Sequence, residues 1–259
     1  MTFATIWQRR AGQTLIRVLA VLVIWQAYIV LLEPTPIAFP SPLAVWRAAI
    51  GIIDRGFVDY SLGEHILASV SRLVPAYILA LAVGIPVGYV MARLPFFRRM
   101  VTPFITLFRP LPSFAWLALI VVWLGFGESS KIAVVFVAAV TIVILGTLDA
   151  VMRVPDVYLD AARVVGTPAS KIVTHVTIPA ATPQILASAR VALTVSWAAL
   201  IASELVAANS GIGVIIIQSA RFIRTDQTFA GLIFLAIIGG FTDRAMSLLE
   251  SRVAPWANR

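Results

Sequence analysis

Six long apolar stretches constrain this chain more than any other feature of its sequence. They cover residues 15–32, 66–91, 101–124, 132–148, 184–207 and 229–249. The hydrocarbon core of a bilayer requires about 20 mostly apolar residues per helix, and each stretch approaches this length. None alternates apolar and polar residues over ten positions, as the strands of a membrane barrel do. The sequence therefore predicts an all-α membrane protein with six transmembrane helices.

The composition agrees with a fold whose main solvent is lipid. Of the 259 residues, 60% are hydrophobic and 12% are charged, which is about half the roughly 25% charged residues of soluble domains. A soluble domain of this size could not bury so much apolar surface, so a disordered chain, a coiled coil and an ordinary cytosolic enzyme are excluded. We expect one permease-like domain over residues 1–259, in which 1–60 hold the first span and an interfacial helix and 61–259 hold a five-span core.

Two features set the orientation of the predicted spans. Glu33-Pro34-Thr35-Pro36 follows the first stretch where a signal peptide would have small residues, so we expect an uncleaved first helix. Most basic residues fall at the termini and in the even-numbered loops, which predicts that both termini are cytoplasmic. This distribution explains the net charge of +8 without a nucleic-acid partner. The opposite side holds only Arg47, Arg55, Lys131, Arg221 and Arg224.

A short helix is predicted in the loop after the first stretch. Ser41 can cap its N-terminus, and Pro42 suits its first position. The apolar residues that follow share one helical face, which is typical of a helix lying at the membrane interface. A loop helix packed on other spans is the alternative. The residues of this face are Leu43, Trp46, Ala49, Ile50 and Ile53.

The loop of residues 153–180 is the longest polar interruption on the predicted cytoplasmic side. Pro155 can begin a first helix, and Gly166 can end it in a left-handed conformation. Thr167-Pro168 then favours the start of a second helix, which Pro179 cannot continue. Ala161-Ala162 would let the first helix enter a cleft on another protein. A plain helical hairpin that shields the bundle explains the same pattern.

At this loop the sequence resembles a known family. Asp160-Ala161-Ala162, then Gly166, then Val176-Thr177-Ile178-Pro179 is similar to the EAA motif of bacterial ABC importer permeases, with the same spacing and three conservative departures. In that family the loop holds a coupling helix that sits in a groove of the cytoplasmic ATPase. The resemblance implies that the coupling residues are Asp160, Ala161, Ala162, Gly166, Ile178 and Pro179.

Further motifs resemble the nitrate/sulfonate/taurine branch of these permeases, and most of all its taurine importers. They are residues 39–42, 109–116 and 123–131, and Ala202-Ser203-Glu204-Leu205 after Trp197. The resemblance implies a type I importer permease of the bacterial inner membrane, which forms a homodimer. It also implies an ATPase dimer carrying ATP and magnesium, and an extracytoplasmic binding protein. The expected substrate is taurine or another small aliphatic sulfonate; nitrate, a thiamine precursor and riboflavin are alternatives.

The chain lacks the residues of several other chemistries. Its two lysines, Lys131 and Lys171, both precede Ile rather than follow Gly, so no phosphate-binding loop is present. We therefore expect no enzyme activity and no cofactor in this chain. It has no cysteine, and His65 and His175 are expected to be interfacial polar residues. The spans hold few central carboxylates, which leaves an ion-coupled transporter as a remote alternative.

Five residues are candidates for a substrate pathway: Arg109, Trp116, Ser196, Trp197 and Glu204. Pro110 and Pro112 should break or kink the third span, and Arg109 beside them could meet an anion. A structural kink with a snorkelling or paired Arg109 is the alternative. The fifth-span residues could instead join helices through hydrogen bonds. Arg72 and Arg190 lie near span ends, where we expect them to snorkel toward the headgroups.

Overall fold

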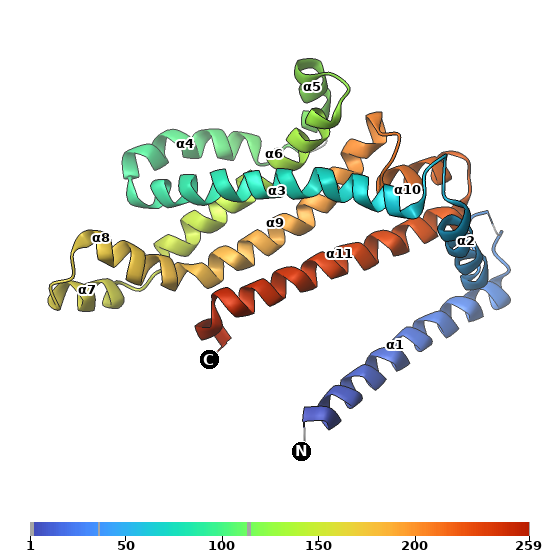
Figure 1. Ribbon diagram of the computed structural model, residues 1–259, viewed down its shortest axis with the longest axis horizontal. Helices are drawn as coiled ribbons and strands as arrows, with labels where there is room; N and C mark the ends of the chain where they lie inside the picture. The colour runs from blue at the N-terminus through green and yellow to red at the C-terminus, as the bar shows by residue number, and fades with distance from the viewer. Residues whose placement is uncertain (1–2, 36, 113–114, 259) are drawn as a thin grey trace. The chain divides into compact units, whose positions relative to one another are not determined.

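The computed structural model of the protein describes residues 3–35, 37–112 and 115–258, with side chains from Ile16 on except those of residues 18, 207, 257 and 258. These residues are helical apart from short connections, and the single β-bridge among them joins Phe57 and Tyr60. The prediction of an all-α fold is confirmed (Figure 1). The helices are α1 (Phe3–Leu32), α2 (Pro42–Arg55), α3 (Leu62–Arg93), α4 (Pro95–Phe108), α5 (Ala115–Leu124), α6 (Glu128–Met152), α7 (Asp156–Val164), α8 (Ala169–Ile172), α9 (Ile178–Ala207), α10 (Ile212–Arg221) and α11 (Thr225–Val253).

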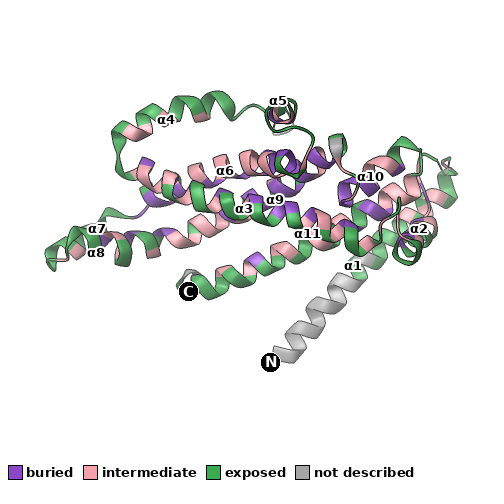
Figure 2. Cartoon of the chain, turned by 45° about the horizontal axis from the view of Figure 1, so that its top comes forward, coloured by how far each residue is buried: buried purple, intermediate pink, exposed green. Residues whose placement is uncertain are grey.

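Four helical segments of the described chain are long and apolar enough to cross a membrane. They are Leu62–Arg93, Glu128–Met152, Ala169–Val206 and Thr225–Val253, and they contain the second, fourth, fifth and sixth predicted stretches. Large apolar side chains remain exposed along these helices, such as Leu67 on α3 and Ile237 on α11. Figure 2 shows that buried residues follow only one side of α3 and α6. Such exposed apolar surface fits helices whose outer faces meet lipid.

The third predicted stretch is interrupted where its prolines lie. Helix α4 ends at Phe108, and α5 begins at Ala115. Pro110 and Pro112 have no N–H for a helical hydrogen bond, so the predicted break is confirmed. Ser113 and Phe114, which belong to the branch motif, lie outside the described residues.

The chain divides into two compact units, and α10 and α11 contribute residues to both. The first unit comprises residues 1–64 and 215–234, and the second comprises residues 65–214 and 235–259. In the first unit an aromatic cluster joins α1, the loop before α2, and α11. The Trp25 indole donates a hydrogen bond to the Pro40 carbonyl at 3.1 Å. The rings of Trp25 and Phe229 lie on opposite sides of this cluster from Tyr28 only through their shared neighbour Phe39, which contacts all three.

Helix α2 begins as the sequence predicts. The Ser41 hydroxyl accepts a hydrogen bond from the Ala44 N–H at 3.2 Å, and Pro42 occupies the first helical position. Val45, Ala49 and Ile52 are buried, whereas Trp46 and the other members of the predicted stripe are exposed. The helix therefore packs through one face and leaves a second apolar face open, so features of both alternatives are present.

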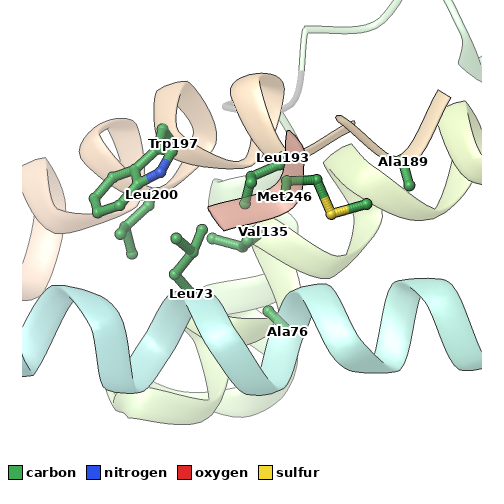
Figure 3. Close-up of a cluster of buried hydrophobic side chains, with 8 residues drawn as sticks. All are labelled: Leu73, Ala76, Val135, Ala189, Leu193, Trp197, Leu200 and Met246. Atoms are coloured by element: carbon green, nitrogen blue, oxygen red, sulfur yellow. The ribbon is translucent and has the colours of Figure 1, made fainter. Parts of the chain in front are cut away.

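The core of the second unit lies among α3, α6, α9 and the C-terminal part of α11. Figure 3 shows Leu73 of α3, Val135 of α6, Trp197 of α9 and Met246 of α11 in one buried cluster. Small residues let the helices approach closely. A Cβ atom on Gly84 of α3 would lie 2.7 Å from Val143 of α6, which is too close for two carbon atoms.

The end of the 153–180 loop differs from the prediction. The chain does not stop at Pro179 but passes from α8 through a π-helical turn, Val173–Thr177, directly into α9. Pro179 sits in the first turn of α9, where a missing N–H is tolerated, and the wider π turn accommodates the change in register. Pro168, rather than Thr167, occupies the N-cap position of α8.

Candidate functional site

A large cavity in the second unit lies beside the break between α4 and α5. Its volume is about 800 Å³, and it is lined by residues of α4 to α6 and α9. Arg109 and Trp116 both line it, so the structure brings these two pathway candidates together. The Trp116 ring meets Phe108 edge-on at 5.1 Å, which fixes one wall.

The cavity is mostly apolar with a few polar groups. Arg109 is its one basic lining residue among those described, and Asp149 its one acidic residue. The Asp149 carboxylate is paired with Arg153 at 3.0 Å, so part of its charge is already compensated. Gly146 and Ser188 mark a close approach of α6 and α9 in the wall, since a Cβ atom on Gly146 would collide with Ser188. An apolar cavity with one uncompensated cation suits a small organic anion.

The structure places Ser196 and Trp197 elsewhere. The Ser196 hydroxyl is buried and donates to the Ala192 carbonyl at 2.7 Å within α9. The Trp197 indole donates to the Thr242 hydroxyl at 3.1 Å, which links α9 to α11. Trp197 also lines a separate cavity of about 140 Å³. Neither residue lines the cavity of Arg109.

Glu204 is held inside the protein by three donors. Its carboxylate accepts hydrogen bonds from the Ser69 hydroxyl, the Arg72 guanidinium and the Gly213 N–H, each at 2.8 Å. Its side chain is fully buried. A carboxylate with this many partners is stabilised as part of the fold. Arg109 and Glu204, the two charges expected near a zwitterion's path, therefore do not share a cavity.

The expectation that Arg72 snorkels is wrong. Its side chain is 5% exposed and pairs with Glu204 and with Glu128 at the start of α6. It also donates to the Ser210 carbonyl at 2.7 Å. Burial of a guanidinium requires such partners, and they tie α3, α6 and the end of α9 together. Arg190 also finds a partner, since it forms a two-bond ion pair with Asp243 of α11.

His65 is likewise buried rather than interfacial. Its Nδ1 accepts a hydrogen bond from the Gly211 N–H at 2.9 Å, and the Ser69 hydroxyl accepts one from the Ile212 N–H at 2.9 Å. Sequence reasoning missed this network, although a signal was present. His65, Ser69 and Arg72 are spaced i, i+4 and i+7, so they share one face of an apolar helix.

The predicted coupling segment projects from the second unit. Helix α7 has no buried residue, and Gly166 follows it with a φ of +76°, as its predicted left-handed role requires. Asp160 is exposed and pairs with Arg163 at 2.8 Å. Val164 and Val165 are more than 80% exposed, an apolar surface that fits a partner protein.

The root of this segment is firmly held. Val151 and Val154 pack in a buried cluster with Ala181 of α9. Arg93 of α3 donates to the buried Thr177 hydroxyl at 2.7 Å, beside Ile178 and Pro179. An anchored root and an exposed tip would transmit a push on α7 to the spanning helices.

Comparison with known proteins shows the class to which this fold and segment belong. Residues 84–255 match the family of binding-protein-dependent transport system inner membrane components. The chain belongs to this family. It is therefore an inner-membrane permease component of an ABC importer, which works with an ATPase and a binding protein and is not itself an enzyme.

Individual relatives narrow the branch. The taurine transport system permease protein TauC of Escherichia coli (strain K12) is 35% identical over 91% of this chain and 86% of its own length. The nitrate import permease protein NrtB of Synechocystis sp. is 29% identical over 93% and 88%. A Bacillus subtilis protein named for aliphatic sulfonate transport, SsuC, is 28% identical over 92% and 85%. The chain is a permease of the taurine/nitrate/sulfonate branch.

A solved structure supports the fold. A chain of the MetNI methionine ABC transporter in an inward-facing conformation matches with a TM-score of 0.65 and 20% identity, covering 74% of this chain and 95% of that chain. The architecture is that of a type I ABC importer permease.

Proposed function

We propose that this chain forms the membrane pathway by which taurine or a related small aliphatic sulfonate is imported. The observation that carries the proposal is the 35% identity to TauC over 91% of the chain. ATP and magnesium would bind to a partner ATPase dimer rather than to this chain. Two copies of the chain would form the pathway in lipid, with both termini in the cytoplasm and a binding protein delivering the substrate from outside.

The cavity of Arg109 and Trp116 suits such a substrate. A sulfonate is an oxyanion, and a guanidinium can donate two parallel hydrogen bonds to it. The aromatic and aliphatic walls would contact a short carbon chain. Ser196, Trp197 and Glu204 would act at a distance from this contact, by holding α9 in place beside the cavity.

The exposed α7 segment suits the coupling role. Asp160, Ala161 and Ala162 would enter a groove of the ATPase, and Gly166 would set the turn behind them. Ile178 and Pro179, at the start of α9, would pass the movement to the spanning helix. ATP must then bind preferentially to one conformation, because a ligand shifts an equilibrium only by its differential affinity.

Nitrate import is the second candidate, because NrtB is also similar along nearly the whole chain. Growth of a deletion strain on taurine as sole sulfur source separates the two. The account expects loss of growth on taurine, normal growth on sulfate, and rescue by the wild-type gene. Normal growth on taurine, in a strain lacking other taurine importers, would remove this substrate and make nitrate uptake the next test.

A further inference from the structure

A second large cavity lies in the first unit, where neither the family motifs nor the coupling segment assigns a role. Its volume is about 1000 Å³, and α2, the end of α10 and the start of α11 line it. Arg47, Arg55 and Arg224 are among the lining residues, and Asp226 is the only acidic one of those described. Positive charge is therefore in excess in this cavity.

The three guanidinium groups have no internal partner. Among the described residues, none of them takes part in a hydrogen bond or an ion pair. The Arg55 guanidinium lies over Gly51, where a Cβ atom would approach its Nη2 to 3.0 Å. Like charges gathered around one cavity repel each other, so an anion between them would lower the energy of the arrangement.

Ser219 supplies an independent observation. It lines the same cavity, it is 1% exposed, and its hydroxyl has no hydrogen-bond partner. A buried hydroxyl without a partner is costly, and native proteins nearly always satisfy one. The Arg224 N–H donates to the Ser219 carbonyl at 2.8 Å, which holds these two residues side by side. A ligand oxygen in the cavity could accept from both side chains.

We propose that this cavity binds a tetrahedral oxyanion, the phosphate or sulfonate group shared by anionic phospholipid headgroups and small sulfonate solutes. Arg47, Arg55 and Arg224 would bind its oxygens, and Ser219 would donate to one of them. Gln218 and Gln227, which also line the cavity, add neutral donors. On the predicted orientation, these arginines are three of only five basic residues outside.

The surroundings of the cavity also suit the lipid source of this group. Leu43 and Ile50 lie one turn before and after Arg47 on α2 and, like Trp46, are exposed. A phospholipid whose phosphate lies in the cavity could place its acyl chains against this face. A volume of about 1000 Å³ also exceeds what a small sulfonate needs, since whole drug-sized ligands occupy roughly 300–1,000 Å³.

The test measures binding to the full-length chain purified in a neutral detergent. Inorganic phosphate and ethanesulfonate are titrated by calorimetry, and nanodiscs of phosphatidylcholine with or without phosphatidylglycerol supply the lipid. Saturable binding of the free anions points to the solute, and selective retention of phosphatidylglycerol points to the headgroup. Either result supports the proposal, and its absence with every probe overturns it.

Matched variants identify the cavity. Removing two charged donors with R47Q and R55Q together should weaken binding roughly tenfold or more. The control R221Q removes the same charge from an exposed residue that does not line the cavity and should leave binding unchanged. S219A should raise the melting temperature of the ligand-free protein, because it removes an unpaired hydroxyl, and yet weaken binding. Equal losses in R221Q and the double variant, or a loss confined to R109Q, would overturn the proposal. No readout depends on taurine transport, so the result is independent of the proposed function.

Discussion

At the scale of single residues, the most consequential group is the buried carboxylate of Glu204. Its three donors at 2.8 Å include a guanidinium that is itself 5% exposed. Replacing Glu204 with Ala would leave the buried Arg72 with one carboxylate fewer, and removal of one partner of a buried ion pair costs about 3–5 kcal/mol. We expect a large fall in the melting temperature of the purified protein.

The control for this prediction is R153A, which breaks an ion pair whose side chains are 74% and 61% exposed. Exposed pairs contribute less than about 1 kcal/mol, so its melting temperature should stay near that of the wild type. Similar melting temperatures for the two variants would show that the Glu204 network does not stabilise the fold.

Arg109 is the residue whose charge matters most for the proposed pathway. R109Q keeps a polar side chain but removes the cation from the cavity, so sulfonate uptake should fall about tenfold or more. R109K keeps the charge and loses only the two-pronged geometry, and its uptake should lie between the other two. The measurement is the initial rate of labelled taurine uptake at equal membrane expression. Equal rates in all three proteins would mean that the Arg109 charge does not contact the substrate.

The sequence predicted chemistry at this scale only where a motif marked the position. Arg109 was found because two prolines follow it. His65 and Arg72 were expected near the headgroups because each lies close to a span end. Their burial depends on Gly211, Ser210 and Glu128, which are distant in sequence. Pairing of this kind depends on tertiary structure, which helix periodicity does not describe.

At the scale of elements, the turn between α7 and α8 provides the sharpest test. Gly166 has a φ of +76°, and nothing lies within 4 Å of the position of a Cβ atom. G166V should therefore act through backbone strain alone, which is about 1–3 kcal/mol for a bulky residue at positive φ. We expect the turn to shift and taurine uptake to fall while membrane insertion is unchanged.

The matched control for Gly166 is G166N, because Asn adopts the left-handed conformation at low cost. Its uptake should stay near that of the wild type. If G166V transports as well as G166N, the left-handed turn has no part in coupling.

Element boundaries could be predicted where local chemistry sets them. Ser41 and Pro42 began α2, and Pro110 and Pro112 interrupted the third stretch, because capping and the missing proline N–H act within a few residues. The continuation of α8 into α9 could not be predicted in the same way. It depends on a π turn stabilised by Thr177, whose partner Arg93 comes from α3.

At the scale of the whole molecule, the orientation of the chain in the membrane can be tested without background, because the sequence has no cysteine. Single cysteines at Ser170 on α8 and Asp59 after α2 replace exposed residues. In intact spheroplasts, a membrane-impermeant maleimide should label D59C but not S170C, and inverted vesicles should reverse the pattern. Labelling of S170C from outside would contradict the cytoplasmic placement of α7 and α8.

The central claim is that this permease carries a small sulfonate, and uptake of labelled taurine tests it most directly. The gene is deleted in a strain without other taurine importers, and initial uptake is measured with and without the wild-type gene. The account predicts that uptake requires the gene, that excess ethanesulfonate competes, and that excess nitrate does not. Unchanged uptake in the deletion strain, or competition by nitrate alone, would contradict the assignment of a sulfonate as the substrate.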